Sequence, residues 1–168
     1  MGTAARWEKP LEKPGQTRHN LNMGKMLYLD NCCFNRPYDD MSLLKNYLEA
    51  EAKTYIQKEI LQGRYELAWS YIMDYEAAFN PFSDRRAQIV KWKNIAVVDV
   101  DESDDILATA SRLMKKGIKP KDSLHLACAL GAGCGYFITT DSKILNKQVE
   151  NIAVVNPIDF IAAMEVRK

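Results

Sequence analysis

Short apolar runs alternate along this chain with segments of helical periodicity. The runs have the length and continuous apolar character of strands buried on both faces of a parallel sheet. They cover residues 26–30, 65–70, 95–98, 136–139 and 152–155. Helices are predicted over residues 42–63, 84–92, 103–116 and 121–131, with a further one through Glu76 that ends near Asn80. Because strand and helix alternate, the sequence predicts an α/β fold with a mostly parallel sheet.

The longest predicted helix, residues 42–63, has a stripe of apolar residues. Ser42 has the side chain of an N-cap, and Gly63 is a typical residue after a helix end. Leu44, Leu48, Tyr55 and Ile56 recur at spacings close to one helical face, so the helix is expected to be amphipathic. The residues before it, 31–40, predict a loop.

The chain has 168 residues, of which 47% are hydrophobic, so one well-packed domain is expected. Residues 1–25 carry proline and charge without apolar periodicity, which predicts a flexible leader before a domain at residues 26–168. With 23 basic and 22 acidic residues the net charge is +1. Any contact with nucleic acid must therefore come from a local basic patch.

Neither a membrane segment nor a cysteine framework is indicated. No apolar run approaches the ~20 residues that span a bilayer. Of the cysteines Cys32, Cys33, Cys128 and Cys134, none forms a C-x-x-C pair, which argues against a zinc site or a disulfide framework. Reduced thiols in a cytoplasmic protein fit this pattern better.

Four acidic residues stand where a predicted strand ends or a helix begins. Asp30 and Asp141 follow the runs at 26–30 and 136–139, Glu76 lies on the helix after Ser70, and Asp122 opens the helix at 121–131. Singly, each Asp also suits a turn or a helix cap. Carboxyl ends of parallel strands share one crevice, however, and clustered carboxylates usually need a divalent cation. The pattern predicts a metal site with oxygen ligands.

Glu76 is distinguished from Asp74 by helix geometry. At ~100° per residue, Glu76 lies near Ile72, Met73 and Phe79, and Asp74 points away. We expect Glu76 to face the crevice, where an acid needs a partner, and Asp74 to be solvated by water. A salt-bridged surface Glu is the alternative.

The histidines and cysteines are weaker candidates for metal binding or catalysis than the acidic residues. We expect His125, one turn after Asp122, to pack and hydrogen-bond within its helix and not to hold a metal or a phosphate. His19 is the only other histidine, which excludes a His-rich transition-metal site. Cys32 and Cys33 suit small buried hydrophobes better than nucleophiles, since no convincing base accompanies them.

Four motifs in this order together resemble the PIN-domain family, and most closely its VapC-type toxins. They are residues 27–31 at the first strand, Ser70 with Glu76 six residues later, residues 121–129 and residues 137–141. The last two are the specific ones, and the resemblance covers residues 26–160. It implies a three-layer α/β/α domain in which Asp30, Glu76, Asp122 and Asp141 bind Mg²⁺ or Mn²⁺. Asn31 and Thr140 match polar positions that help to order such a site.

The resemblance also implies an endoribonuclease that is the toxin of a toxin–antitoxin pair. Metal-assisted attack by water leaves 5′-phosphate and 3′-hydroxyl ends. A small antitoxin is the implied partner, and a homodimer is expected through the helix of Leu44 and Leu48. The candidate phosphate contacts are Arg36, Arg85, Arg86 and Lys121.

Two other functions stay open. An aspartyl-phosphate phosphatase would use Asp30 as its nucleophile, but Cys32 stands where such enzymes usually have a second Asp. A PIN-like module could instead keep the metal and act through protein contacts alone, which four retained acids argue against without excluding.

Overall fold

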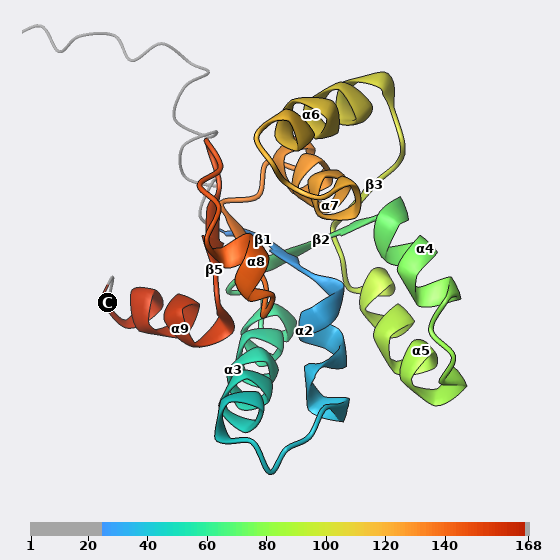
Figure 1. Ribbon diagram of the computed structural model, residues 1–168. Helices are drawn as coiled ribbons and strands as arrows, with labels where there is room; N and C mark the ends of the chain where they lie inside the picture. Colours follow the sequence, from blue (N-terminus) through green and yellow to red (C-terminus); the bar gives the residue numbers. More distant parts are fainter. Residues whose placement is uncertain (1–24, 167–168) are drawn as a thin grey trace, which may run out of the picture.

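The computed structural model describes residues 25–166, and its centre is a five-stranded sheet (Figure 1). All pairs are parallel, in the order β3-β2-β1-β4-β5, so the predicted α/β fold is confirmed. The strands are β1 (Met26–Leu29), β2 (Glu66–Ser70), β3 (Val98–Val100), β4 (Tyr136–Ile138) and β5 (Ala153–Val155). The predicted leader lies outside the described residues, except for Lys25.

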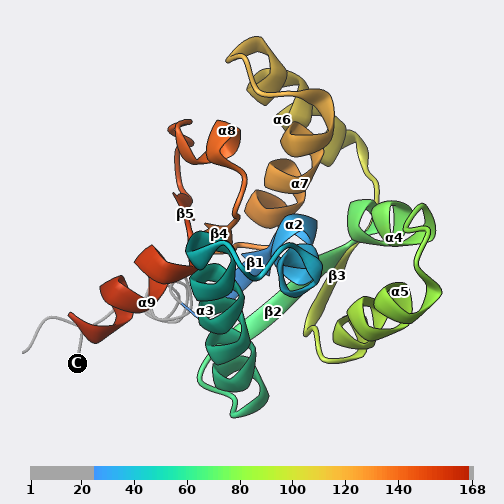
Figure 2. The same cartoon turned by 60° about the horizontal axis from the view of Figure 1, so that its bottom comes forward.

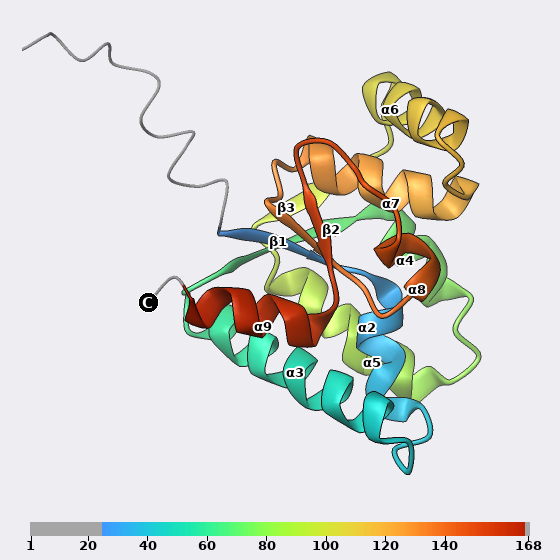
Figure 3. The same cartoon turned by 60° about the vertical axis from the view of Figure 1, so that its left-hand side comes forward.

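Helices cover both faces of the sheet and make three layers. Figures 1 and 3 show α6 and α7 on one face, with α3 and α9 side by side on the other. The helices are α2 (Asn31–Asn35), α3 (Leu44–Leu61), α4 (Tyr71–Ala78), α5 (Ser83–Val90), α6 (Asp104–Lys115), α7 (Pro120–Gly131), α8 (Ser142–Leu145) and α9 (Pro157–Glu165), with 3₁₀ turns η1 (Arg36–Tyr38) and η2 (Lys91–Asn94). None of these helices combines the length and apolar character needed to cross a membrane.

Three local predictions were wrong. The expected loop at 31–40 contains α2 and η1, which are too short to show amphipathic periodicity. The strand expected at 95–98 is β3, displaced toward residue 100. Ser42 does not cap α3: its hydroxyl donates to Asp40 Oδ1 at 2.6 Å, and Leu43 occupies the N-cap position.

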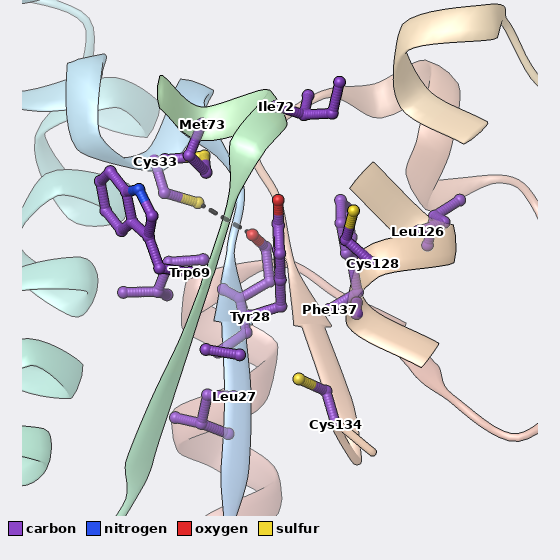
Figure 4. Packing of buried hydrophobic residues seen from close by; sticks show 14 of the residues in the cluster. Leu27, Tyr28, Cys33, Trp69, Ile72, Met73, Leu126, Cys128, Cys134 and Phe137 are labelled. Carbon is purple, nitrogen blue, oxygen red and sulfur yellow. Dashed lines mark hydrogen bonds between the residues drawn. The ribbon is translucent and has the colours of Figure 1, made fainter. Parts of the chain in front are cut away.

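The central strands β1, β2 and β4 are buried on both faces, as their continuous apolar runs predict, whereas the edge strands β3 and β5 are partly exposed. Tyr28 and Phe137 stack with ring centroids 5.4 Å apart, and both are fully buried. Figure 4 shows them on the side of Cys128 from α7, whereas Trp69 lies on the opposite side of the sheet. This alternation determines which side chains reach the carboxyl edge together.

The sheet reverses its direction of growth at β1. From β1 the chain adds β2 and β3 on one side and then returns to add β4 and β5 on the other. Ligands of open α/β sheets bind at such a reversal, beyond the carboxyl ends of the two central strands. Here those ends are joined by the amide of Asp30, which donates to the carbonyl of Ile138 at 2.9 Å.

Candidate active site

Asp30 lies at the reversal point, between β1 and α2. Its side chain is 7% exposed and makes no helix-capping bond. Oδ2 instead accepts a hydrogen bond from Thr139 Oγ1 at 2.8 Å and one from Cys32 Sγ at 3.2 Å. Two donors on the same oxygen therefore orient the carboxylate, and neither contact was predicted from the sequence.

Thr139, and not the predicted Thr140, contacts Asp30. Thr140 Oγ1 is buried and has no hydrogen-bond partner among the described residues. The register explains the difference, because Tyr28 pairs with Phe137 and Leu29 with Ile138, which places Asp30 opposite Thr139. The parallel register was the signal that could have found Thr139, but the sequence alone does not show it.

Glu76 faces the crevice from α4, as predicted. Its side chain is 11% exposed, and its two oxygens bind different cationic or polar partners: Lys121 Nζ at 2.7 Å and His125 Nε2 at 2.8 Å. Burial alone would raise its pKa, but the hydrogen bonds and charges of His125 and Lys121 outweigh burial and lower the pKa. The carboxylate is thus ionised and compensated. Ile72 and Met73 are buried beside it, but Phe79 is 69% exposed, so the predicted apolar surround was partly wrong.

His125 makes its hydrogen bonds across the fold and not within α7, contrary to the prediction. Its ring is buried, with Nδ1 2.7 Å from the Tyr28 hydroxyl and Nε2 on Glu76. The Tyr28 hydroxyl is also 2.6 Å from Ser70 Oγ. An ionised Glu76 only accepts, so Nε2 carries a proton, and a neutral ring then accepts from Tyr28 at Nδ1. The chain Ser70–Tyr28–His125–Glu76 links the core of the sheet to the crevice.

Asp122 and Asp141, the other two predicted acids, differ in their surroundings. Burial raises the pKa of Asp122, and the negative charges of Asp30 and Asp141 raise it further, against smaller opposing contributions from His125 and Lys121. Asp141 caps α8 through Oδ1, which accepts from the Lys143 amide at 2.8 Å. The structure therefore brings Asp30 and Glu76 together with His125, and Asp122 and Asp141 do not belong to that group. Asp122 interacts with the charges of Asp30 and Asp141, and its own charge is not fully compensated.

This donor set fits a divalent cation. Among the described residues, Asp30, Glu76 and His125 each offer a ligand atom within 4.8 Å of one another. His125 already uses both ring nitrogens, so carboxylates are the donors left, and hard cations such as Mg²⁺ prefer oxygen. The raised pKa of Asp122 shows that a positive charge placed among these acids would stabilise their ionised forms.

Asp74 is not simply solvated by water, so that expectation was wrong. It points away from the crevice, but Oδ1 accepts from the indole of Trp69 at 2.9 Å, and Oδ2 lies 2.6 Å from Lys93 Nζ. Lys93 also contacts Asp99 at 3.3 Å. Asp74 therefore joins α4 to β2 and η2, and a substitution there would test the fold more than the site.

Of the four predicted phosphate contacts, Arg36 lies inside the fold and the other three lie at or near the surface. Arg36 is 17% exposed and its Nε lies 3.0 Å from Glu49 Oε2, inside the fold and not in the crevice. Arg86 is exposed, and Arg85 is half-buried over the ring of Phe82. Lys121 is 58% exposed and directly at the acids. Lys121 and Arg85 are accordingly the candidates next to the site.

Comparison with known proteins identifies the class. The PIN domain family model matches residues 38–150, more than half of the chain, so the chain belongs to the PIN domain family. The match begins at Tyr38, after the strand that carries Asp30. No protein of curated function matches the chain.

Two solved structures share the fold. VapBC2 from Rickettsia felis, bound to a DNA fragment from its promoter, is 16% identical with a TM-score of 0.50, covering 78% of this chain and 98% of its own. DNA-bound VapBC from Salmonella typhimurium is 15% identical with a TM-score of 0.50, covering 79% and 98%. At these identities the likeness shows a shared fold.

Proposed function

We propose that the protein is a Mg²⁺- or Mn²⁺-dependent endoribonuclease of the VapC type. The observation that supports this is the proximity of Asp30 and Glu76 at the reversal point of a PIN-family sheet, with Asp122 in electrostatic contact with Asp30 and Asp141. We assign all four acids to catalysis and metal binding. A bound divalent cation would supply an activated water and neutralise charge at the leaving oxygen.

The chain's own residues would position the reactants. Thr139 and Cys32 fix the orientation of the Asp30 carboxylate, and His125 fixes that of Glu76. Asn31 follows Asp30 directly and stands at the mouth of the crevice. Lys121 would hold a phosphate oxygen of RNA next to the acids. Cleavage would leave 5′-phosphate and 3′-hydroxyl ends.

We further propose a small antitoxin partner whose tail places an Arg or Lys in the crevice. The shared fold with VapBC structures supports a partner of this kind. Lys121 Nζ bound to Glu76 at 2.7 Å shows that the acids accept a cationic side chain. Co-purification from the native host would identify such a partner, and its absence there would contradict the proposal.

The test is cleavage of total RNA by the purified full chain with Mn²⁺ or Mg²⁺, followed by analysis of the ends. We expect EDTA to abolish cleavage, and Asp30→Asn and Glu76→Gln to reduce it at least tenfold, as lost ligands or their supports commonly do. Calorimetric titration with Mn²⁺ should show weaker binding for the same variants. Glu51→Gln, an exposed change on α3, is the matched control.

Equal cleavage in EDTA would contradict the proposal. Binding of Mn²⁺ without cleavage of any RNA would favour an interaction module that keeps the metal, and hydrolysis of a small phosphoester alone would favour a phosphatase.

A further inference from the structure

A groove opens beside the acids and continues away from them. It has a volume of about 480 Å³ and shares Asn31, Glu76 and Lys121 with the candidate site. Its remaining lining comes from α2, α4 and the start of α5, which Figures 1 and 2 show close together. Any substrate whose reacting bond lies at the acids must therefore extend past this groove or into it.

One wall of the groove is aromatic. Tyr75 and Phe79 lie on successive turns of α4, with exposed fractions of 58% and 69% and ring centroids 4.7 Å apart. They do not belong to the hydrophobic core. The rings are tilted by 53° to each other, so they form an apolar corner in which one ring can face a planar ligand while the other contacts its edge.

The amide side chains of three asparagines also line the groove. Asn80 Nδ2 donates to Asn35 Oδ1 at 3.4 Å, and Asn35 Nδ2 donates to Asn31 Oδ1 at 3.2 Å. The bonds orient the three amides in series. The Nδ2 group of Asn31 has no partner among the described residues and is left to donate to a ligand, and the long Asn80 bond is readily exchanged.

The outer end of the groove carries a fixed cation. The guanidinium of Arg85 lies 4.0 Å from the ring centroid of Phe82 and 4.8 Å from that of Tyr38. Held between these rings, it makes no ion pair with another described residue and keeps its donors for an anion. Lys121 marks the inner end, so a positive charge stands at each end of an aromatic and amide-lined groove.

We propose that this groove binds one unpaired base of single-stranded RNA beside the scissile phosphate. One of the Tyr75 and Phe79 rings stacks on the base and the other contacts its edge, the Asn amides contact its polar edge, and Arg85 and Lys121 hold the flanking phosphates. A duplex would be excluded, because its bases are already stacked and their faces are unavailable. The inference rests on the proposed endoribonuclease and assigns a base-binding subsite of its substrate to this groove.

Charge and position favour RNA here over a protein partner. A polyanion can pair with Arg85 and can also share Lys121, whose ammonium group already binds Glu76, and the groove leads directly to the acids where a phosphodiester would react. Amides in series suit the donor and acceptor edge of a base.

The test separates binding from cleavage. Full-length protein in EDTA is titrated against a fluorescent single-stranded RNA of about ten nucleotides, and against the same strand in a duplex. We expect Tyr75→Ala with Phe79→Ala to weaken single-strand binding about tenfold or more, as lost base stacking does. Tyr55→Ala, which removes an exposed aromatic ring of α3 outside the groove, should bind as the wild type does.

A paired change in the RNA makes the test specific. An oligonucleotide with one abasic position at the groove should bind the wild type more weakly, and the aromatic double variant should show no further loss with it. Circular dichroism confirms that each variant is folded.

The outcomes are distinguishable. If the wild type binds and cleaves RNA but the double variant binds equally well, the groove assignment is wrong and the nuclease stands. If the double variant instead loses self-association or a protein partner while RNA binding is unchanged, the groove is a protein interface. If the wild type neither binds nor cleaves single-stranded RNA, the groove assignment and the proposed function both fail.

Discussion

Asp122 is the carboxylate of the candidate site whose charge is least compensated. Burial and the neighbouring Asp30 and Asp141 raise its pKa, whereas Glu76 has its pKa lowered by His125 and Lys121. The two acids therefore act oppositely on folding. Ionised Glu76 stabilises the folded chain, and ionised Asp122 destabilises it until a cation is present.

We predict that Asp122→Asn stabilises the protein in EDTA. With a folded pKa above its ordinary value, Asp122 destabilises the fold above that pKa, and the effect is lost as pH falls into the ordinary Asp range near ~4. The gain at neutral pH should appear as a small rise in Tm, at roughly 2–4 °C per kcal/mol for a chain of this length. Thermal melts against pH measure it.

Asp101→Asn, an exposed change after β3, should leave Tm nearly unchanged. Added Mg²⁺ should raise Tm more for the wild type than for Asp122→Asn, because only the wild type keeps the full ligand set. A variant that is less stable than the wild type at neutral pH would contradict this account.

Individual residues of the site differ in how far the sequence could predict them. Asp30 and Asp141 could be predicted because each follows a continuous apolar run, and the ends of such runs can be recognised in the sequence. Thr139 depends on the β1–β4 register, and the partners of His125 depend on how α4 and α7 meet over β1. Such pairings between distant segments leave no local signal.

At the scale of elements, the junction of η1, α3 and α9 is held by a buried charge. Glu49 is fully buried, with Arg36 Nε 3.0 Å from Oε2 and Asn156 Nδ2 donating to Oε1 at 2.7 Å. Arg36 also contacts Asp39 at 2.8 Å. These contacts join η1, which follows Asp30 and α2 in the chain, to α3 and to the start of α9. They therefore help to hold the segment that carries Asp30 in place.

We predict that Arg36→Ala destabilises the fold by about 3 kcal/mol, because it leaves the charge of the buried Glu49 with only the exposed Lys45 at 3.9 Å as an ion-pair partner. Glu49→Gln in the same chain should recover most of this loss, since the amide keeps the Asn156 contact without the charge. Urea denaturation measures both. Arg112→Ala, at an exposed site of α6, should stay within ~0.5 kcal/mol of the wild type.

The opposite result would support the role predicted for Arg36 from the sequence, which is contact with phosphate. If Arg36→Ala unfolds as the wild type does but binds RNA more weakly, the residue contacts phosphate and the ion pair contributes little.

Elements with regular periodicity were predictable and short ones were not. The helix α6 follows from its Ser103 cap and α7 from its apolar pattern, and the parallel sheet follows from the alternation of strands and helices. The strand order was not predictable, because alternation does not specify which strands are neighbours. The five-residue α2 has no room for a pattern. The helix α9 had a usable signal, because Asn156 caps it and Pro157 is its first residue, but the segment lies beyond the last predicted strand.

At the scale of the whole molecule, the first turns of α3 present an apolar face to solvent. Leu43, Leu44, Tyr47 and Leu48 are between 44% and 69% exposed. Of the predicted apolar stripe only Ile56 is buried, and Leu44, Leu48 and Tyr55 are exposed. The core is built instead from Ala50, Ala52 and Ile60 along the same helix.

An exposed face of this kind indicates an interface, and we predict that it joins two copies of the chain. A two-fold axis brings the same patch of each copy together, so that each leucine covers its equivalent or a neighbour. Light scattering after size exclusion should give the mass of a dimer for the wild type and of a monomer for Leu44→Glu with Leu48→Glu. Both should retain the same circular dichroism, because neither side chain supports the fold of one copy.

Leu61→Glu tests whether dimerisation depends on the position of the substituted leucine or only on the loss of apolar area. Leu61 is 61% exposed at the other end of α3, so the variant should remain dimeric. A wild type that stays monomeric at every concentration would remove the homodimer. A Leu44→Glu and Leu48→Glu variant that stays dimeric would place the interface elsewhere. If dimerisation is lost only when Tyr75 and Phe79 are changed, the interface lies at the groove, and that result would also overturn the assignment of those rings to RNA.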